Sequence, residues 1–218
     1  MKAIILGGSK GIGKAIRLHL ENICSDVVYT STKEIDTSDL ITTREFIKKH
    51  SRCDVLVLNT GGPEPIPFEK TTEEMWLKYF NQLFLSFVLI LQNIKIKKGG
   101  YVFLISSHVI KEPEEKLVLS SSLRLGFASV FKTVSKINLG KGISYINIAP
   151  GPTHTDRLAG LVRLSGKTME AFARSLPTKK VASPDDIGKF IQFVVKNKIS
   201  ALNGVTINFD MGLSNYVL

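Results

Sequence analysis

The chain has 218 residues, 29 of them Lys or Arg and 19 Asp or Glu, so its formal net charge is +10. This length suits one α/β domain with a full core, and the sequence shows no Pro-rich or low-complexity linker, so we predict a single domain over residues 1–218. The basic residues are scattered singly or in pairs such as Lys48-Lys49, without interleaved aromatic residues, which favours a solvated basic surface over a nucleic-acid-binding face.

Two cysteines, Cys24 and Cys53, form neither a metal-binding pattern nor a disulfide framework, which favours a reducing, cytoplasmic setting without a metal site. The first residues already read as a core strand, so no signal peptide is expected. The longest apolar stretch, residues 83–91, is far shorter than the roughly 20 residues of a membrane span, so no membrane is expected either.

The chain is organised around residues 6–13, which follow the apolar run 3–6 and precede a helical stretch from Lys14. A strand, a glycine-rich turn and a helix N-terminus in this order form a site for a dinucleotide pyrophosphate, because glycine lets the backbone approach the phosphates and the helix N–H groups face their charge. The alternative is a glycine-rich turn without a ligand. The turn residues expected to contact the cofactor are Gly7, Ser9, Lys10, Gly11, Ile12 and Gly13.

Residues 26–30 predict a second strand, which ends where a dinucleotide-binding fold meets the adenosine ribose. The strand runs into Ser31, Thr32 and Lys33, without the carboxylate that binds the ribose hydroxyls in NAD-selective proteins. Lys33 and Lys10 add positive charge on this side, which suits the extra phosphate of NADP. We therefore favour NADP(H) over NAD(H) as the cofactor; the alternative is that both lysines are ordinary surface residues.

The next stretch is too short for a complete crossover. Only five residues separate Thr30 from Asp36, whereas a parallel crossover with its helix needs about 10 to 12. We therefore predict that the third strand of a doubly wound sheet and the helix before it are missing or rudimentary. Ser38 or Asp39 then caps a helix that runs to about His50.

A long helix is predicted over residues 73–95, after a capping signal at 71–74. Its middle is apolar nearly all round, apart from Asn81, Gln82 and Ser86. A helix with so little polar surface is buried on more than one side, so we expect it to pack against a partner subunit in a homodimer or homotetramer.

The remaining elements continue an alternation of strands and helices. Further strands are expected at residues 54–58, 101–105, 143–149 and 205–209, and further helices at 120–139 and 184–196. Residues 155–177 read as an irregular helical insertion, which we interpret as a substrate lid. This alternation predicts a doubly wound Rossmann fold, a mainly parallel sheet with helices on both faces and ligands at the carboxyl ends of the strands.

This order of motifs resembles the short-chain dehydrogenase/reductase family, from Lys2 to about Gly212. The glycine turn matches the family's Thr-Gly-xxx-Gly-Ile-Gly pattern, with Leu in place of Thr. The resemblance implies cofactor contacts at the Asn-Asn-Ala-Gly motif, the adenine-binding aspartate and the Pro-Gly motif. These correspond to Asn59, Thr60, Gly61, Asp36, Pro150, Gly151, Thr153 and Thr155.

The resemblance also implies a catalytic Ser, Tyr and Lys, together with an Asn on the long helix. Ser107 matches the Ser and Asn81 matches the Asn. Ser120 stands where the Tyr is expected and Arg124 where the Lys is expected, a pattern that resembles a divergent branch similar to 3-oxoacyl-[acyl-carrier-protein] reductases. Arg124 keeps a fork of donors suited to the nicotinamide ribose.

A serine hydroxyl is a far weaker acid than a phenol and Arg stays protonated, so Ser120 and Arg124 cannot reproduce the usual proton relay. His108 and His154 have an unperturbed pKa of about 6.5 that suits proton donation, although each is more often a surface or hydrogen-bonded histidine. Water relayed through Ser120 or Asn81 is a third source. We therefore expect an NADP(H)-dependent oxidoreductase acting on a carbonyl or alcohol with a non-standard proton donor, or alternatively a catalytically silent dinucleotide-binding scaffold or sensor.

Overall fold

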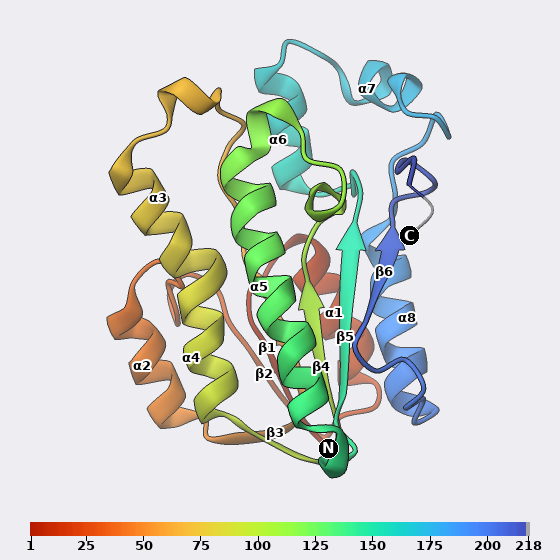
Figure 1. Ribbon diagram of the computed structural model, residues 1–218. Helices are drawn as coiled ribbons and strands as arrows, with labels where there is room; N and C mark the ends of the chain where they lie inside the picture. Colours follow the sequence, from red (N-terminus) through yellow and green to blue (C-terminus); the bar gives the residue numbers. More distant parts are fainter. Residues whose placement is uncertain (217–218) are drawn as a thin grey trace.

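The computed structural model describes residues 1–216, and at its centre is a parallel sheet (Figure 1). Within that range the sheet has six strands in the order β2-β1-β3-β4-β5-β6, and every described pairing is parallel. The strands are β1 (Lys2–Ile5), β2 (Asp26–Tyr29), β3 (Arg52–Leu58), β4 (Lys95–Ile105), β5 (Ser144–Pro150) and β6 (Val205–Phe209). The doubly wound α/β fold expected from the alternation of elements is confirmed.

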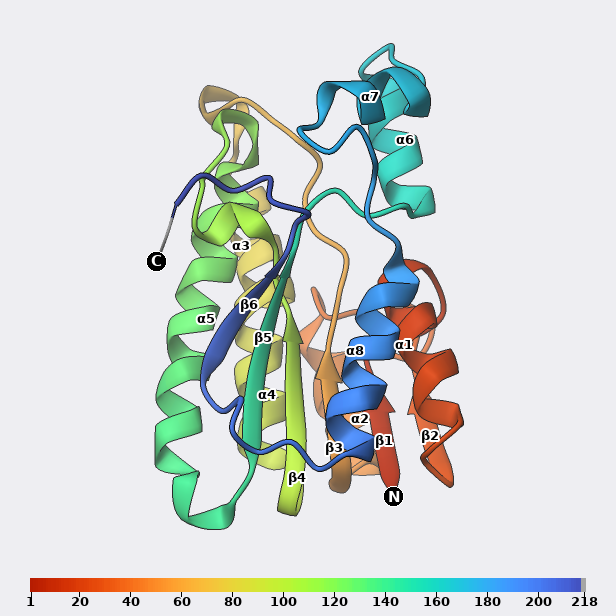
Figure 2. The same ribbon diagram turned by 90° about the vertical axis from the view of Figure 1, so that its right-hand side faces the viewer.

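Helices cover both faces of the sheet (Figure 2). One face carries α1 (Gly11–Glu21) and α8 (Pro184–Lys196), and the other carries α2 (Leu40–Lys49), α4 (Ser86–Asn93) and α5 (Val118–Ile137). Strand side chains alternate between the two resulting cores: Ile5 and Val57 lie in the first, whereas Ile4 and Leu56 lie in the second. The central strands β1 and β3 are therefore apolar on both sides, which explains their apolar sequences.

The predicted absence of a third strand on this side of the sheet is confirmed. β2 is the edge strand and pairs with β1 alone in the described sheet, and β1 pairs on its other side with β3. After β2 the chain passes through a short irregular segment to α2, whose N-cap Asp39 accepts a bond from the Ile41 amide at 2.8 Å. The few residues between Thr30 and α2 leave no length for a further strand and helix.

The long helix is interrupted and ends earlier than predicted. It consists of α3 (Glu73–Phe80), a π-helical stretch (Asn81–Leu85) and α4, and Lys95 already belongs to β4. The strand begins early because it pairs with the start of β3 before an irregularity between Cys53 and Val55, then pairs again from Tyr101. Gly100 permits this irregularity, since a Cβ there would lie 2.4 Å from the Asp54 carbonyl oxygen.

The α5 helix lies about two residues earlier than predicted and belongs to the core. Together with the preceding turn (Glu115–Ile137) it is long and apolar enough to span a membrane by length and composition alone. Its buried side chains, among them Phe127 and Phe131, pack against the sheet beside Tyr145. Packing on the sheet accounts for part of its apolar composition, whereas Leu125 and Ile137 on the same helix are exposed.

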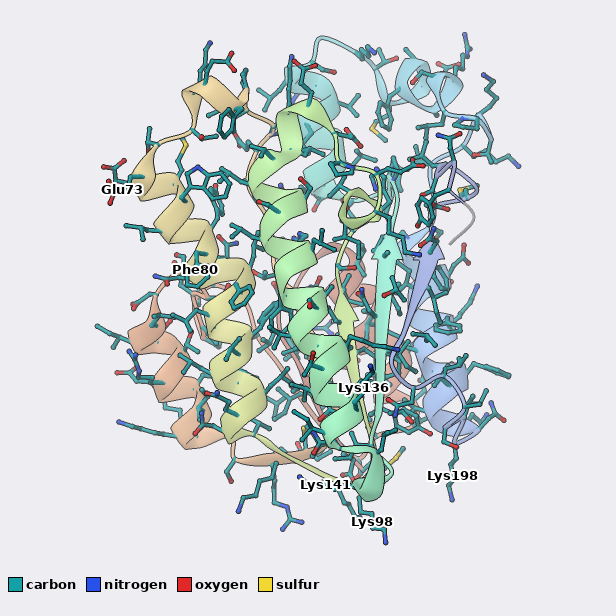
Figure 3. The ribbon with its side chains drawn as sticks, viewed as in Figure 1. Glu73, Phe80, Lys98, Lys136, Lys141 and Lys198 are labelled. Carbon is teal, nitrogen blue, oxygen red and sulfur yellow. The ribbon has the colours of Figure 1, made fainter. Side chains whose placement is uncertain are left out.

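The carboxyl ends of the strands are covered by α6 (Asp156–Leu164) and α7 (Met169–Ser175), which correspond to the expected insertion (Figure 2). Lys98, Lys136, Lys141 and Lys198 lie toward the opposite end of the sheet (Figure 3). Part of the positive charge is therefore separated from the face that α6 and α7 cover.

Both cysteines are free and buried in the described chain. Burial raises the pKa of each thiol, that of Cys53 to about 12. These thiols are therefore poor nucleophiles at neutral pH.

Candidate cofactor and active site

The glycine turn between β1 and α1 has no room for side chains at two of its positions. A Cβ on Gly13 would lie 2.1 Å from the carbonyl oxygen of Gly7, and one on Gly7 would lie 2.7 Å from Asn59 Nδ2. Gly7 also has a φ of +61°, in the left-handed region that favours glycine. The turn is therefore packed backbone against backbone, as a close approach to phosphates requires.

Two side chains hold this turn in place from neighbouring strands. The Asn59 amide donates to the carbonyl oxygens of Leu6 and Gly7, both at 3.3 Å, and Thr30 Oγ1 accepts from the Gly7 amide at 3.2 Å. Asn59, expected to contact the cofactor, thus supports the turn. Asn59 is therefore a positioning residue, because its side-chain NH2 group already donates to backbone carbonyl oxygens of the turn.

The N-terminus of α1 is open to an anion. Its N-cap Lys10 makes no side-chain capping bond to the described residues, and the first turn holds no acidic residue. The first N–H groups of a helix have no partner within the helix, and the dipole favours negative charge there. Ile12 packs against the core, so the turn presents backbone and Lys10 to the outside.

A carboxylate lies at the carboxyl end of β2. Glu34 folds back, and its Oε2 accepts from the Ser31 amide at 2.6 Å and from the Ser31 hydroxyl at 2.7 Å. These bonds hold the pKa of Glu34 below its usual value. Residues 31–33 hold no carboxylate, as expected, but Glu34 lies outside the strand and brings one to its end through the turn. Thr32 and Lys33 are exposed beside it.

The loop before α2 contacts the residues that follow β3. Asp36 Oδ1 accepts from the amide and hydroxyl of Ser38 at 2.9 and 2.8 Å, and the Thr37 and Thr60 hydroxyls are 3.0 Å apart. The Asn81 amide donates to the Ser38 carbonyl at 3.4 Å. Asn81 is thereby engaged with this loop.

The neighbouring Gln82 lies closer to the residues that follow β3. Its Nε2 donates to the Gly61 carbonyl at 3.3 Å and approaches Thr60 Oγ1 at 3.5 Å. Sequence reasoning missed Gln82, since the family motif directs attention to Asn81. The interruption of the helix at Asn81–Leu85 is the local feature that changes which side chain faces this loop.

Arg124 lies where the ends of β3 and β4 meet α5. Its guanidinium donates to the carbonyl oxygens of Ile105 at 3.3 Å, Gly61 at 3.2 Å and Thr60 at 3.5 Å. Burial lowers the pKa of Arg124 to about 10, and the positive charge of Arg157 adds to the effect. The group remains a cation at neutral pH, held by backbone dipoles.

Ser120 contacts this guanidinium, and Ser107 follows the end of β4 to which Arg124 donates. Ser120 is buried and its hydroxyl accepts from Arg124 Nε at 3.3 Å. Ser107 follows β4 two residues after Ile105, and its hydroxyl is the N-cap acceptor of the Val109 amide at 3.5 Å. That contact is long for a hydrogen bond, so the Ser107 hydroxyl remains available to another partner.

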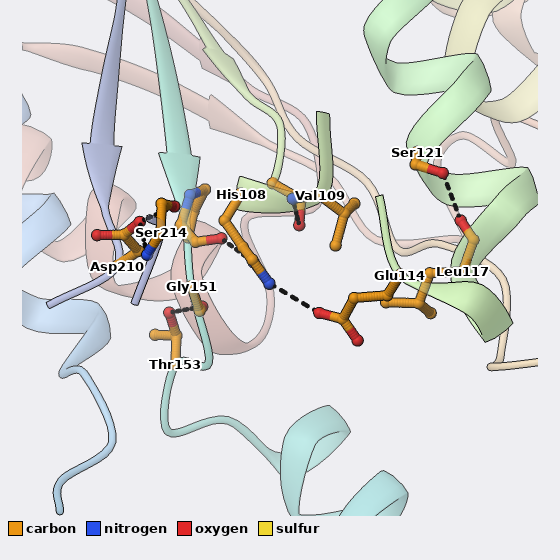
Figure 4. Close-up of polar contacts among 11 residues, drawn as sticks. His108, Val109, Glu114, Leu117, Ser121, Gly151, Thr153, Asp210 and Ser214 are labelled. Carbon is orange, nitrogen blue, oxygen red and sulfur yellow. Dashed lines mark hydrogen bonds and ion pairs between the residues drawn. The ribbon is translucent and has the colours of Figure 1, made fainter. Parts of the chain in front are cut away.

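His108 has partners at both ring nitrogens (Figure 4). Nδ1 lies 3.2 Å from the Pro150 carbonyl oxygen and Nε2 lies 2.9 Å from Glu114 Oε1. Burial alone lowers the pKa of His108, but the bonds to Glu114 and Pro150 outweigh burial and the net pKa is raised. Because a carbonyl and a carboxylate both accept, these contacts favour the doubly protonated ring.

The segment after β5 joins the lid to the glycine turn. A Cβ on Gly11 would lie 3.1 Å from Thr155 Cγ2, and Thr155 caps α6 by accepting from the Leu158 amide at 3.2 Å. Thr153 is buried and donates to the Gly151 carbonyl at 2.9 Å. The side chain of His154 is exposed.

Arg157, in the first turn of α6, reaches across to the loop that follows β3. Its Nη2 donates to the Pro63 carbonyl at 2.7 Å. No motif in the sequence pointed to this residue, because the contact joins segments 94 positions apart.

A family model described as Enoyl-(Acyl carrier protein) reductase matches residues 10–214 of this chain. The chain belongs to the short-chain dehydrogenase/reductase family. Short chain dehydrogenase/reductase astE from Aspergillus oryzae (strain ATCC 42149 / RIB 40) is 26% identical, with 97% of this chain and 94% of that protein covered.

Solved structures of other proteins share the fold. The crystal structure of YwfH, described as an NADPH dependent reductase involved in bacilysin biosynthesis, has a TM-score of 0.86 at 23% identity, with 99% of both chains covered. L-sorbose reductase from Gluconobacter frateurii, solved with NADPH and L-sorbose, has a TM-score of 0.86 at 18% identity, with 99% of this chain and 97% of that chain covered.

As a short-chain dehydrogenase/reductase, the chain has Ser107, Ser120 and Arg124 on neighbouring elements at the carboxyl end of the sheet. Arg124 links Ser120 on α5 to the end of β4, two residues before Ser107. Tyr145, which the sequence places on a core strand, is buried there and its hydroxyl accepts from Asn138. Within residues 1–216, no group of three or more His, Cys, Asp or Glu is placed to hold a metal ion.

The His108–Glu114 pair predicts a pH dependence of stability. The pKa of His108 in the folded protein is raised above 6.5. Its contribution to folding stability is therefore complete below pH 6.5 and is lost as the pH rises through the folded pKa. The pKa of Glu114 is lowered below 4.5, so its contribution is present above that value and is lost on further acidification. The pair therefore stabilises the fold most between these two values.

The Glu114→Gln variant tests this pair, because it removes the charge while keeping the shape. We expect the unfolding free energy to fall by about 1 kcal/mol near pH 6. The loss is modest because the Glu114 side chain is 55% exposed. Near pH 9 the loss should be smaller. Urea unfolding at both pH values measures the difference. An equal loss at both would contradict the ion pair.

Proposed function

We propose that this protein is an NADP(H)-dependent oxidoreductase that transfers hydride to or from a carbonyl or alcohol substrate, with a non-standard proton donor. The observation that carries the proposal is the glycine turn, whose backbone is too closely packed for side chains and which opens onto the uncapped N-terminus of α1. YwfH and L-sorbose reductase, described as an NADPH dependent reductase and as a complex with NADPH, support the cofactor.

The proposed cofactor contacts are the turn residues, the ends of β2 and β3, and the segment after β5. The backbone of Gly7, Ser9, Gly11 and Gly13 and the Thr155 hydroxyl face the pyrophosphate side. Asp36 and the Ser31–Thr32–Lys33 segment lie toward the adenosine side, and Thr60, Pro150 and Thr153 lie toward the nicotinamide side. Arg124, held at the ends of β3 and β4, carries the charge closest to the reacting atoms.

When bound, the cofactor supplies or accepts the hydride at the carbonyl carbon. The Ser107 hydroxyl donates a hydrogen bond to the carbonyl oxygen, and the Arg124 cation stabilises the negative charge that develops on that oxygen. Neither residue delivers the proton at neutral pH, because a serine hydroxyl is too weak an acid and Arg124 stays charged.

The proton therefore comes from another group. Both ring nitrogens of His108 are already bonded, so His108 acts as a donor only if it leaves Glu114 or Pro150. The side chain of His154 is exposed, one residue before the proposed lid, and is the second candidate donor. Water relayed by Ser120 is the third route; Asn81 is engaged with Ser38 and joins such a relay only by releasing it.

The direct test is oxidation of NADPH by purified protein with a panel of ketones and quinones. Slow or narrow turnover is expected, and Ser107→Ala should lower it. The competing function is a catalytically silent dinucleotide-binding scaffold, which the engagement of Arg124 by backbone carbonyls favours. NADPH binding without any oxidation across the panel would support the scaffold.

Cofactor preference is expected to depend on two opposing charges. Tighter binding of NADPH than of NADH is predicted. Lys10→Ala should reduce this difference in affinity, because it removes a cation beside the extra phosphate of NADPH. Glu34→Gln should increase the difference in affinity, because it removes the negative charge that Glu34 places at the end of β2. Fluorescence titration of both cofactors measures the ratio. Equal affinities in the wild type would remove the basis for the preference.

We propose a homodimer or homotetramer formed through α3 and α5. Leu77 and Leu125 are 57% and 51% exposed. Phe80, which is labelled in Figure 3 and is 38% exposed, stacks on Phe84. Such large exposed apolar side chains on neighbouring helices are typical of subunit interfaces. Light scattering should give a multiple of the 24.1 kDa chain mass, and Leu125→Asp should reduce it. A monomeric wild type would contradict the proposal.

We further propose that residues 1–218 form one domain in which 155–177 act as a substrate lid, and that the protein works in the cytoplasm. Arg157 joins the lid to the loop after β3, which supports closure over the site. The two buried free thiols suit a reducing compartment. We propose no nucleic-acid, membrane or metal partner. Residues 217–218 lie outside the described residues.

A further inference from the structure

Two arginines from different elements converge on one loop in the candidate site. A Cβ built on Gly62 would lie 3.0 Å from Arg124 Nη2 and 3.8 Å from Arg157 Nη2. Arg124 reaches this point from α5, beneath the loop, and Arg157 reaches it from the first turn of α6, in the lid. The two glycines at positions 61 and 62 leave the space beside both guanidinium groups clear of side chains.

Neither positive charge forms an ion pair with a carboxylate among residues 1–216, although Glu64 lies close enough to act on Arg157. The acceptors of both arginines are mainly backbone carbonyls. Burial lowers the pKa of Arg157, and the nearby Tyr79 and Glu64 oppose that effect without reversing it. Arg157 as a whole residue is exposed and Arg124 is partly buried, and two like charges at one place repel each other unless an anion binds between them.

Arg157 also has unused donors. A guanidinium carries five N–H groups in a planar fork, and the described contact to Pro63 uses one of them. Arg157 Nη1 lies 3.9 Å from the Cβ position of Gly61, on the same side as Gln82 Nε2 at the same distance. The Nε, Nη1 and Nη2 atoms of Arg124 already donate to protein acceptors, so Arg124 adds mainly its charge. A planar oxyanion at this place would accept from the unused donors of Arg157 beside that charge.

The phosphates of the cofactor have a separate place. Thr155 packs against Gly11 at the glycine turn, whereas Arg157, two residues later, turns away from it toward Pro63. Arg124 donates to the Ser120 hydroxyl and to the Ile105 carbonyl, two residues before Ser107, so an anion beside Arg124 lies next to the proposed reacting groups and belongs to the substrate. We infer that Arg124 and Arg157 together bind a substrate carboxylate, so that the substrate is an oxo acid or the corresponding hydroxy acid.

This inference rests on the proposed hydride-transfer function and names its substrate class. It also gives the lid a reason to close, because one carboxylate would bridge Arg124 in the body of the protein and Arg157 in α6. Substrates of the same carbon skeleton in which an amide replaces the carboxylate lack this bridge. They are expected to react at least about tenfold less efficiently, as a charge-assisted pair of hydrogen bonds would be lost.

The experiment measures binding by calorimetry on the full chain, with oxalate as the probe and with NADP⁺ present. Arg157→Met is expected to weaken oxalate binding at least about tenfold. Arg163→Met is the matched control, because it removes the same charge from the exposed side of the same helix and should leave the affinity unchanged. Arg157→Lys keeps the charge without the fork and should give an intermediate affinity.

NADPH binding is measured separately in each variant. Unchanged NADPH affinity in Arg157→Met, with oxalate binding lost, supports the inference. An equal loss of NADPH and oxalate affinity would assign the pair to a cofactor phosphate and overturn it. The inference would also be overturned if oxalate did not bind the wild type, or if Arg157→Met left oxalate binding unchanged. In either case, NADPH binding by the wild type would leave the proposed function standing. Absence of NADPH binding would instead overturn the proposed function.

Discussion

Replacing Arg124 by Met is expected to lower kcat/KM by about 100-fold or more. The guanidinium is the charge closest to the proposed reacting carbonyl, and loss of a preorganised group that stabilises developing negative charge typically costs about 3 to 4 kcal/mol in the transition state. It also donates to the carbonyl oxygens of Ile105 and Gly61, so its removal loosens the ends of β3 and β4. Steady-state kinetics with the best substrate from the panel measures the effect.

The control for this variant is Arg124→Lys. A lysine keeps the positive charge but presents it as a point charge instead of a planar fork, so it reaches fewer of the carbonyls. We expect a smaller loss, of about tenfold. Urea unfolding of both variants separates a catalytic effect from loss of structure. A wild-type kcat/KM in Arg124→Met would remove Arg124 from the reaction altogether.

Gly13→Ala is expected to abolish cofactor binding in the accessible concentration range and to destabilise the fold. The new Cβ would lie 2.1 Å from the Gly7 carbonyl oxygen and 2.8 Å from Asn59 Nδ2, and the first of these is backbone that cannot move without opening the turn. We expect NADPH affinity to fall by about 100-fold and the unfolding free energy to fall by about 2 to 3 kcal/mol, as overpacking of a close contact does.

Gly160→Ala is the matched control, since a Cβ there meets no atom within 4 Å. Gly160 lies within α6, so the change should raise stability by up to about 1 kcal/mol without affecting NADPH binding. If Gly13→Ala does not fold, Gly11→Ala serves instead. Its Cβ would lie 3.1 Å from a flexible Thr155 side chain, although its φ of +52° adds strain. Wild-type NADPH affinity in both turn variants would show that the turn does not hold the cofactor.

The elements of the fold follow from local patterns in the sequence. The continuous apolar run at 55–58 and the capping Ser183 depend on neighbours within a few residues, and β3 and α8 lie close to their expected positions. The missing third strand followed from the short distance between Thr30 and Asp36, because chain length limits what can be built. Where a long-range pairing decided the boundary, as for Lys95 at the start of β4, the expectation was wrong.

The sequence by itself determined the strand–turn–helix unit, the parallel sheet and the positions of Ser107, Ser120 and Arg124, because motifs and spacing are local properties of the chain. Only the tertiary structure decided that Glu34 returns to Ser31, that Gln82 rather than Asn81 faces Gly61, and that Arg157 reaches Pro63. Turn geometry, the interruption of a helix and contacts across 94 positions set these placements, and no local pattern encodes them.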